Sequence, residues 1–225
     1  MHASGEHDQP AKARYSRPSI KWIGGGSGAG KSTVSKKLAE MFNLDLYATD
    51  DVMLNHASRT SPEQSPHLTR FMSATMDERW LADSPESMLE DFHWFRGEAF
   101  DLIVEDLSSP VPGRRVLAEG FRLLPRMVAP LLTDRNDAIW LLPTEDFRYN
   151  SFVRRGSLWT IPSKTSDPER ALEYLLRRDR LFTDRLRSDI LALGLNFLEI
   201  DGSMTEEETS EVVARELNLS AVAGQ

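Results

Sequence analysis

Five short apolar segments recur along the chain, separated by polar stretches and by segments with the spacing of amphipathic helices. They are rich in β-branched and aromatic side chains, which is typical of buried strands. They occupy residues 20–23, 44–47, 116–118, 138–142 and 196–200. Strands that alternate with helices predict a parallel sheet covered by helices on both of its faces.

Helical spacing is clear after the first predicted strand and after the last one. Residues 32–42 place four apolar side chains on one side, so we expect the crossover helix from the first strand there. Residues 205–217 form the second such segment and begin close to three consecutive glutamates. Negative charge suits the N-terminus of a helix, so this segment predicts a helix after the final strand.

A long insertion separates the second predicted strand from the third. Within it, Ser84 and Pro85 have the pattern of an N-cap followed by proline at the first helical position. They predict one long helix whose inward positions are Met88, Leu89, Phe92, Phe95, Ala99, Leu102 and Ile103. Two prolines and a glycine within residues 108–113 predict that this helix ends before the third strand.

Composition narrows the class of protein. The chain has 225 residues, no cysteine and a formal net charge of -8. The absence of cysteine excludes disulfides and thiolate-metal frameworks. The acidic balance argues against broad binding of nucleic acid or anionic membranes, which requires a basic surface. We therefore expect neither of these partners.

The chain also predicts a simple organisation. Residues 1–18 lack the apolar core of a signal peptide and are expected to form a flexible polar tail. No apolar run approaches the roughly 18 residues that a membrane helix needs. Without internal repeats or a low-complexity linker, residues 19–225 are predicted to form one domain. We expect a cytoplasmic protein that is a monomer or a homodimer.

The sharpest chemical signal is the segment GGSGAGKS at residues 25–32, between the first predicted strand and helix. It matches G-x-x-x-x-G-K-[ST], a loop whose glycines let backbone N–H groups close around phosphates. Lys31 is expected to reach the β- and γ-phosphates, Ser32 to coordinate Mg²⁺, and Thr33 to support the loop. The predicted nucleotide-binding residues are Gly25, Gly26, Ser27, Gly28, Ala29, Gly30, Lys31, Ser32 and Thr33.

Two other interpretations of this glycine-rich segment stay open. The segment could be a turn that merely connects a strand to a helix, but that leaves the Lys-Ser pair without a reason. Residues 24–29 also fit G-x-G-x-x-A, and Asp50 and Asp51 follow about twenty positions later, as in a dinucleotide-binding fold. That pattern is weak by itself, and it too leaves Lys31 and Ser32 unexplained.

Acidic residues follow the second and third predicted strands, at the edge where ligands bind in open α/β sheets. After the second strand, we favour Asp50 as general base and Asp51 as a residue of the acceptor site or metal shell, with exchangeable roles. Thr49 or Asp50 could instead cap a short helix. Glu119 follows the third strand and is predicted to join Ser32 and Asp50 at the metal ion.

A basic cluster follows the fourth predicted strand of this acidic chain. Arginine can compensate the charge that spreads over phosphoryl oxygens, and a flexible segment can deliver it when substrate binds. We therefore predict a lid at residues 148–168, in which Arg154 and Arg155 are catalytic. Most arginines between residues 177 and 187 alternate with acidic residues, which predicts a salt-bridged surface.

Residues 55–108 are predicted to bind the phosphate acceptor, a small molecule. Their candidate binding residues are His56, His67, Arg70, Arg79, Trp80, His93, Trp94 and Arg96. The histidines lack metal-ligand spacing, and aromatic residues of such a segment more often belong to the core. Arg70 and Arg79 are expected to matter if the acceptor is anionic.

The chain resembles the nucleoside kinase, shikimate kinase and antibiotic phosphotransferase-like branch of P-loop kinases. Five segments carry the resemblance in order: GGSGAGKST, YATDD, VLAEG, AIWLLPTEDFRYNSFVRR and NFLEIDGSMT. It implies a three-layer α/β fold with a five-stranded parallel sheet in the order 2-3-1-4-5. It also implies ATP or another NTP with Mg²⁺ at the loop, a helical acceptor insertion, and a lid after the fourth strand.

Three functions from different classes follow. The favoured one is an ATP-dependent, Mg²⁺-dependent phosphotransferase that phosphorylates a hydroxyl or phosphate of a small molecule. The second is a regulatory P-loop NTPase whose bound nucleotide controls a partner, and the third is an NAD(P)-binding protein. The long insertion and the arginine cluster favour the kinase, because a regulatory switch needs no pocket for a second substrate.

Overall fold

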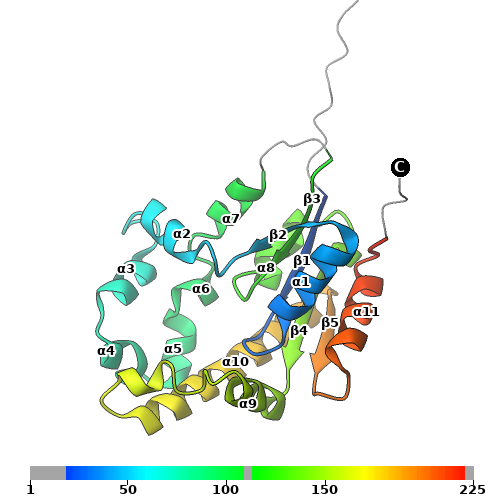
Figure 1. Ribbon diagram of the computed structural model, residues 1–225. Coiled ribbons are helices and arrows are strands. Elements are labelled where there is room, and N and C mark those ends of the chain that lie inside the picture. Colours follow the sequence, from blue (N-terminus) through cyan, green and yellow to red (C-terminus); the bar gives the residue numbers. More distant parts are fainter. Residues whose placement is uncertain (1–18, 109–112, 221–225) are drawn as a thin grey trace, which may run out of the picture.

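Five parallel strands form the centre of the protein, which a computed structural model describes for residues 19–108 and 113–220 (Figure 1). Each strand overlaps one of the predicted apolar segments, and their order is the one that the kinase resemblance implies, β2-β3-β1-β4-β5. The strands are β1 (Ser19–Gly25), β2 (Asp45–Ala48), β3 (Arg115–Glu119), β4 (Ala138–Pro143) and β5 (Asn196–Ile200). The predicted polar tail, residues 1–18, lies outside the described residues.

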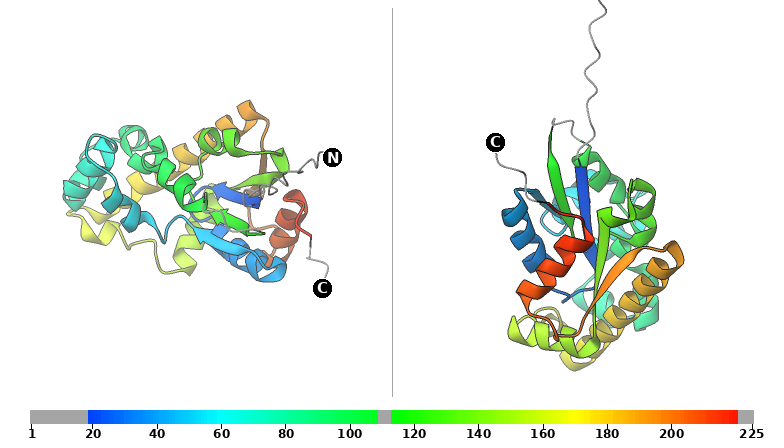
Figure 2. Two further views of the ribbon diagram at one scale, coloured as in Figure 1. Left: turned by 90° about the horizontal axis from the view of Figure 1, so that it is seen from above. Right: turned by 90° about the vertical axis from the view of Figure 1, so that its right-hand side faces the viewer.

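Helices cover both faces of the sheet, which makes three layers (Figure 2). One face packs against α1 (Lys31–Phe42) and α11 (Glu206–Glu216), as predicted from their amphipathic spacing. The other packs against α7 (Phe100–Leu107), α8 (Pro125–Val128) and α10 (Pro168–Leu193). Alternate residues of β4 supply the two cores, since Trp140 belongs to one and Leu141 to the other. No helix of the described segments has the length and apolar character needed to cross a membrane.

The insertion between β2 and β3 is built from six short helices (Figure 1). They are α2 (Met53–Arg59), α3 (Pro66–Ser73), α4 (Met76–Trp80), α5 (Pro85–Asp91), α6 (His93–Arg96) and α7. Ser84 caps α5 with Pro85 in its first turn, as predicted. The single long helix predicted from residue 84 to residue 103 is wrong.

Backbone conformation breaks that predicted helix at two places. Phe92 has an extended ψ of 113°, and Gly97 and Ala99 have left-handed φ values of 87° and 57°. The breaks turn Phe95 toward the main core, where its ring stacks on that of Phe182 at 3.7 Å. Aromatic packing therefore overrides a helical spacing that is nearly continuous in the sequence. Most of the predicted helix end, residues 109–112, lies outside the described residues.

The segment predicted as a lid, residues 148–168, begins within α9 (Glu145–Arg154) and ends at the first residue of α10. Its first residue is fixed in place, because the buried Arg148 donates a hydrogen bond to Thr183 Oγ1 of α10 at 2.5 Å. Further along, the backbone N–H of Ser166 donates to Asp77 Oδ1 at 2.8 Å. The segment therefore contacts the insertion, because Asp77 belongs to α4.

Candidate active site

The phosphate loop joins the carboxyl end of β1 to the first turn of α1. Its backbone is left-handed at three glycines, with φ of 130° at Gly25, 80° at Gly28 and 79° at Gly30. A Cβ at Gly25 would lie 2.0 Å from the carbonyl oxygen of Leu141, so the pairing with β4 leaves no room for a side chain. The path of the loop therefore requires glycine at these positions.

Lys31 lies across the loop at the N-terminus of α1. Only 9% of it is exposed, and its ammonium group donates a hydrogen bond to the carbonyl oxygen of Gly26 at 2.8 Å. Burial lowers the pKa of Lys31 from its ordinary value, while the charges of Glu119 and Asp50 act in the opposite direction. The ammonium group and the positive end of α1 together make the loop a site for anions.

The three residues predicted to bind the metal ion through oxygen atoms lie beside the loop. The Ser32 hydroxyl donates a hydrogen bond to Glu119 Oε1 at 2.9 Å, and Asp50 lies exposed in the turn after β2. Desolvation raises the pKa of Asp50 and of Glu119, and the Lys31 ammonium opposes the shift in both. Hydroxyl and carboxylate oxygens are ligands that Mg²⁺ prefers, and phosphates and waters supply its remaining ligands in such sites. The residues therefore fit the predicted ion.

Protein side chains alone would not complete a metal site. In residues 19–108 and 113–220, no group of three or more His, Cys, Asp or Glu side chains is arranged to hold a metal ion. Mg²⁺ is usually bound by one or two carboxylates plus substrate oxygens, so nucleotide phosphates would supply the remaining ligands.

The two aspartates after β2 are both exposed, but they differ in the charges that they influence. Asp50 acts on the pKa of both Lys31 and Glu119, whereas Asp51 donates its backbone N–H to the carbonyl oxygen of Ala48 at 3.2 Å. Helix α2 begins at Met53 without a hydrogen bond from a capping side chain, so neither Thr49 nor Asp50 caps it. The capping alternative therefore finds no support.

Gly120 holds the ends of β2 and β3 together. Its φ is 143°, and a Cβ there would lie 1.7 Å from Oγ1 of the buried Thr49. Gly120→Ala is expected to lower the free energy of unfolding by about 3 kcal/mol or more, since strain and overpacking act together. Gly194→Ala is the control: its φ of 64° is also left-handed, but nothing lies within 4 Å of the added Cβ. Urea unfolding should show a loss of only about 1 kcal/mol there, and an equal loss in both variants would contradict this account.

Arg122 is a residue of the site that the sequence reasoning missed. It is only 2% exposed, stands three positions after Glu119, and its charge acts on Asp50. Its guanidinium group donates to the carbonyl oxygens of Thr49 at 3.4 Å and Ala99 at 3.1 Å, and it lies 4.1 Å from the Trp94 ring. Burial lowers the pKa of Arg122 to about 10, which still leaves it charged at neutral pH. The only sequence signal was its position just beyond a strand end.

A chain of hydrogen bonds continues from Arg122 into the insertion. Arg122 Nη2 lies 3.0 Å from His56 Nδ1, and His56 Nε2 lies 2.8 Å from Asp106 Oδ2. Because the guanidinium can only donate, His56 accepts at Nδ1 and donates from Nε2. Burial alone would raise the pKa of Asp106, but hydrogen bonds from Arg59, His56 and Tyr47 lower it to about 2. These hydrogen bonds hold the guanidinium group of Arg122 in place, and therefore keep its positive charge beside Asp50.

A cleft of about 610 Å³ extends from the phosphate loop between α9 and the turn after β5. Gly30, Arg154, Arg155 and Gly202 are among the residues that line it. The charge of Arg155 acts on Lys31, so this arginine lies near the phosphate loop. The cleft is of the size typical for small ligands, about 300–1,000 Å³, and adjoins the predicted phosphate site. The catalytic role of Arg154 and Arg155 stays a prediction.

Most arginines of α10 form the salt-bridged surface expected from their spacing. The pairs are Arg177 with Glu86, Arg180 with Glu145, Arg185 with Glu90 and Arg187 with Glu199. Arg178 is different, because it is buried and its guanidinium group lies near the aromatic rings of Trp80, Phe92 and Phe95.

Comparison with known proteins supports a P-loop fold. Residues 24–92 match a family model described as an AAA domain, which covers less than half of the chain. No curated protein matches the sequence. The match, the loop and the strand order together give the chain a P-loop fold that resembles that of P-loop small-molecule kinases.

Solved structures with similarity to the chain include TT1252 and two kinases. TT1252 from Thermus thermophilus is 19% identical, with 90% of this chain and 99% of that chain covered and a TM-score of 0.49. A gluconokinase from Sinorhizobium meliloti 1021 is 16% identical, with 90% and 92% covered and a TM-score of 0.42. Deoxyadenosine kinase from M. mycoides with bound dATP is 13% identical, with 88% and 99% covered and a TM-score of 0.45. With TM-scores below 0.5, these three similarities carry no assignment of function.

Proposed function

We propose that the protein is a kinase that transfers the terminal phosphoryl group of Mg-ATP, or of another Mg-NTP, to a hydroxyl or phosphate of a small molecule. The observation that carries the proposal is the set of charged groups around the phosphate loop. Lys31 and Glu119 are buried, and the exposed Asp50 lies beside them at the edge where β1, β2 and β3 end. Burying charged groups is unfavourable unless they have partners, so the gathering of these three at one edge indicates a site for a charged ligand.

Each residue of the site would have a separate role in the reaction. Backbone N–H groups of the loop and the Lys31 ammonium bind and orient the phosphates. Ser32 and Glu119 would hold Mg²⁺, which neutralises phosphate charge when bound. Asp50 would accept the proton of the acceptor hydroxyl, and Arg122 keeps a positive charge beside that carboxylate.

The acceptor would bind on the insertion side of Asp50. Arg122 bonds to the carbonyl oxygen of Ala99 and lies over the Trp94 ring, so the wall nearest Asp50 comes from residues of the insertion. On the opposite side, Arg154 and Arg155 would complete the site from α9 and the segment that follows it. Catalysis would then rest on positioning and charge compensation, without a covalent intermediate.

A product assay tests the proposal. The purified protein is incubated with Mg-ATP and a pool of small hydroxyl and phosphate compounds, and mass spectrometry is used to find products with one added phosphoryl group. We expect at least one product that requires both the protein and Mg²⁺. Nucleotide-dependent capture of a protein partner without any product would favour the regulatory NTPase instead.

A further inference from the structure

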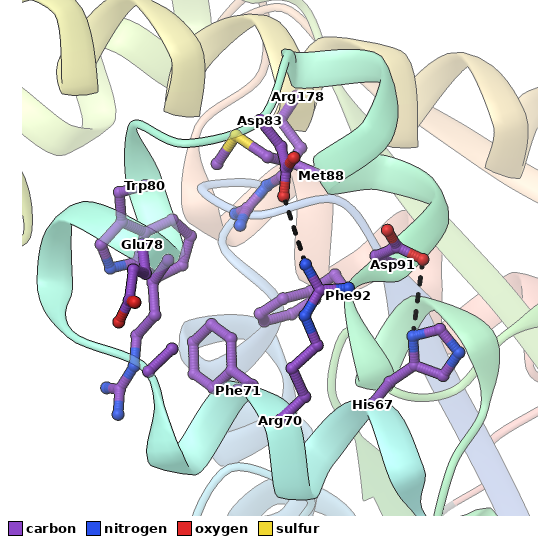
Figure 3. Close-up of a pocket in the computed structure, with 12 residues that line it drawn as sticks. His67, Arg70, Phe71, Glu78, Trp80, Asp83, Met88, Asp91, Phe92 and Arg178 are labelled. Atoms are coloured by element: carbon purple, nitrogen blue, oxygen red, sulfur yellow. Dashed lines mark ion pairs between the residues drawn. The ribbon is translucent and has the colours of Figure 1, made fainter.

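A small pocket of about 60 Å³ lies within the insertion, between its helices and α10 (Figure 3). The rings of Phe71, Trp80 and Phe92 line it, with ring centroids of Phe71 and Trp80 5.6 Å apart and of Phe71 and Phe92 5.4 Å apart. Pockets that hold a whole small ligand typically measure about 300–1,000 Å³. This one therefore has the size of a subsite for a single chemical group.

The acidic side chains of this pocket already have partners. Asp83 lies 3.8 Å from Arg70, and Asp91 lies 3.5 Å from His67, as the dashed lines of Figure 3 show. Glu78 accepts hydrogen bonds from the backbone N–H of Thr75 at 2.7 Å and from its hydroxyl at 2.8 Å. The carboxylates thus have their hydrogen bonds and ion pairs within the protein.

The basic side chains of the pocket, in contrast, have unmatched donors. Arg178 is 7% exposed and uses Nε and Nη2 to bind Asp179 at 3.2 and 2.7 Å. Its Nη1, and Nε of Arg79, are buried and have no hydrogen-bond partner within residues 19–108 and 113–220. Buried donors without partners are rare in proteins and call for an explanation. Here they indicate a ligand that accepts hydrogen bonds.

The positive charges of this region are carried by arginines, and three carboxylates, Glu78, Asp83 and Asp91, also line the pocket. His93 lies 4.7 Å from the Phe71 ring, and its pKa is lowered to about 3, first by burial and then by the nearby Arg122, His67, Arg178 and Arg79. His93 therefore stays neutral, and the guanidinium groups of Arg178 and Arg79 carry the charge. The guanidinium carbon of Arg79 also lies 4.7 Å from the Phe71 ring, so both arginines border the aromatic wall.

The pocket lies on the acceptor side of the proposed kinase site. Asp179, which binds Arg178, is near enough to Lys31 to influence its pKa. Arg178 therefore stands between the phosphate loop and the pocket. A molecule whose hydroxyl reaches Asp50 could place another of its groups in this pocket.

We propose that the pocket binds an oxyanion of the acceptor, a carboxylate or phosphate group distinct from the group that is phosphorylated. The guanidinium groups of Arg79 and Arg178, which line the pocket, bind its oxygens, and the rings of Phe71, Trp80 and Phe92 surround the carbon atoms next to it. That this ligand is the phosphate acceptor rests on the proposed function. The binding of an oxyanion in the pocket does not.

The test uses three probes that share a phenyl ring and differ in the polar group. Benzoate carries a carboxylate, phenyl phosphate a phosphate, and benzyl alcohol a neutral hydroxyl. Each is titrated into the full chain labelled with ¹⁵N, and the Arg79 Nε–H resonance is followed by NMR. The resonance is assigned from its absence in Arg79→Gln. At least one of the two oxyanions should shift it, whereas benzyl alcohol should not. Which of the two binds more tightly distinguishes a carboxylate from a phosphate.

Two variants with the same change in charge supply the control. Arg79 is substituted rather than Arg178, because Arg79 is only half-buried on a short helix and its loss leaves the core intact. Calorimetric titration compares the variants: Arg79→Gln should weaken binding of the oxyanion about tenfold or more, since a charge-assisted hydrogen bond is lost. Arg215→Gln should change it little, because Arg215 is exposed on α11, on the other face of the sheet.

The inference fails if neither oxyanion shifts the Arg79 resonance, if benzyl alcohol shifts it equally, or if Arg79→Gln binds as tightly as the wild type. Titration of Mg-ATP into the same samples keeps the two proposals apart. Binding of ATP without binding of an oxyanion overturns only the subsite. Binding of an oxyanion without binding of ATP supports the subsite and counts against the kinase.

Discussion

Asp50→Asn is expected to lower kcat by about 10²- to 10⁴-fold, the usual contribution of a general base, while the affinity for Mg-ATP changes little. The substitution keeps the size of the side chain and removes the carboxylate that would accept the proton of the acceptor. Asp50 is the carboxylate beyond the end of β2 that acts on Lys31 and is itself influenced by Arg122. Steady-state kinetics with the acceptor found in the product assay measure the effect.

Asp51→Asn is the matched control for this prediction. It removes the same charge one residue further along, from an exposed side chain that is not among the charges acting on Lys31. We expect kcat to stay within about threefold of the wild type, as for most exposed substitutions outside the reacting groups. If Asp51→Asn caused the larger loss, the roles of the two aspartates would have to be exchanged.

The carboxylate of Asp50 should also make kcat/KM fall at low pH. Desolvation raises the pKa of Asp50 and of Glu119 above their ordinary values, so both groups take up protons at a higher pH than freely solvated carboxyls. Because the ionised form of Asp50 would be the base, kcat/KM should fall as the pH falls through this raised pKa. The two groups lie close together, so this pKa belongs to them as a pair.

Lys31→Ala is expected to weaken the binding of Mg-ATP and to lower kcat/KM by about 10²- to 10³-fold, the usual effect of removing a group that stabilises transition-state charge. The ammonium group lies across the loop, and the loop has no other side-chain cation. Lys36→Ala is the control, since Lys36 is exposed on the same helix. Lys36→Ala should leave the affinity for Mg-ATP and kcat/KM unchanged within error. An equal loss in both variants would mean a general effect of charge.

Local signals explain what could be predicted from the sequence. Buried parallel strands leave apolar runs, and the phosphate loop needs glycines and a lysine at fixed spacing, so both could be recognised without a structure. The strand order was inferred from the kinase resemblance, and the structure confirms that order. Asp50 and Glu119 could be found because Glu119 ends β3 and Asp50 lies two positions after β2, although their roles remain predictions.

Distant contacts explain what could not be predicted. The helix after Ser84 is broken because Phe95 packs against Phe182, 87 positions along the chain, and periodicity does not report such a partner. Arg122 looks like any arginine of a loop until His56 and the carbonyl oxygen of Ala99 are placed around it. Likewise, Arg178 has the spacing of its solvent-exposed neighbours, and only the fold shows it buried near Trp80.

The central claim is that backbone N–H groups of residues 25–32 and the ammonium group of Lys31 bind the terminal phosphates of a nucleotide. Calorimetric titration of the wild-type chain with ATP, ADP and AMP, each with Mg²⁺, tests it most directly. The account predicts heat of binding for ATP and ADP and far weaker binding of AMP, which lacks the β- and γ-phosphates. No binding of ATP, or equal binding of all three nucleotides, would contradict it.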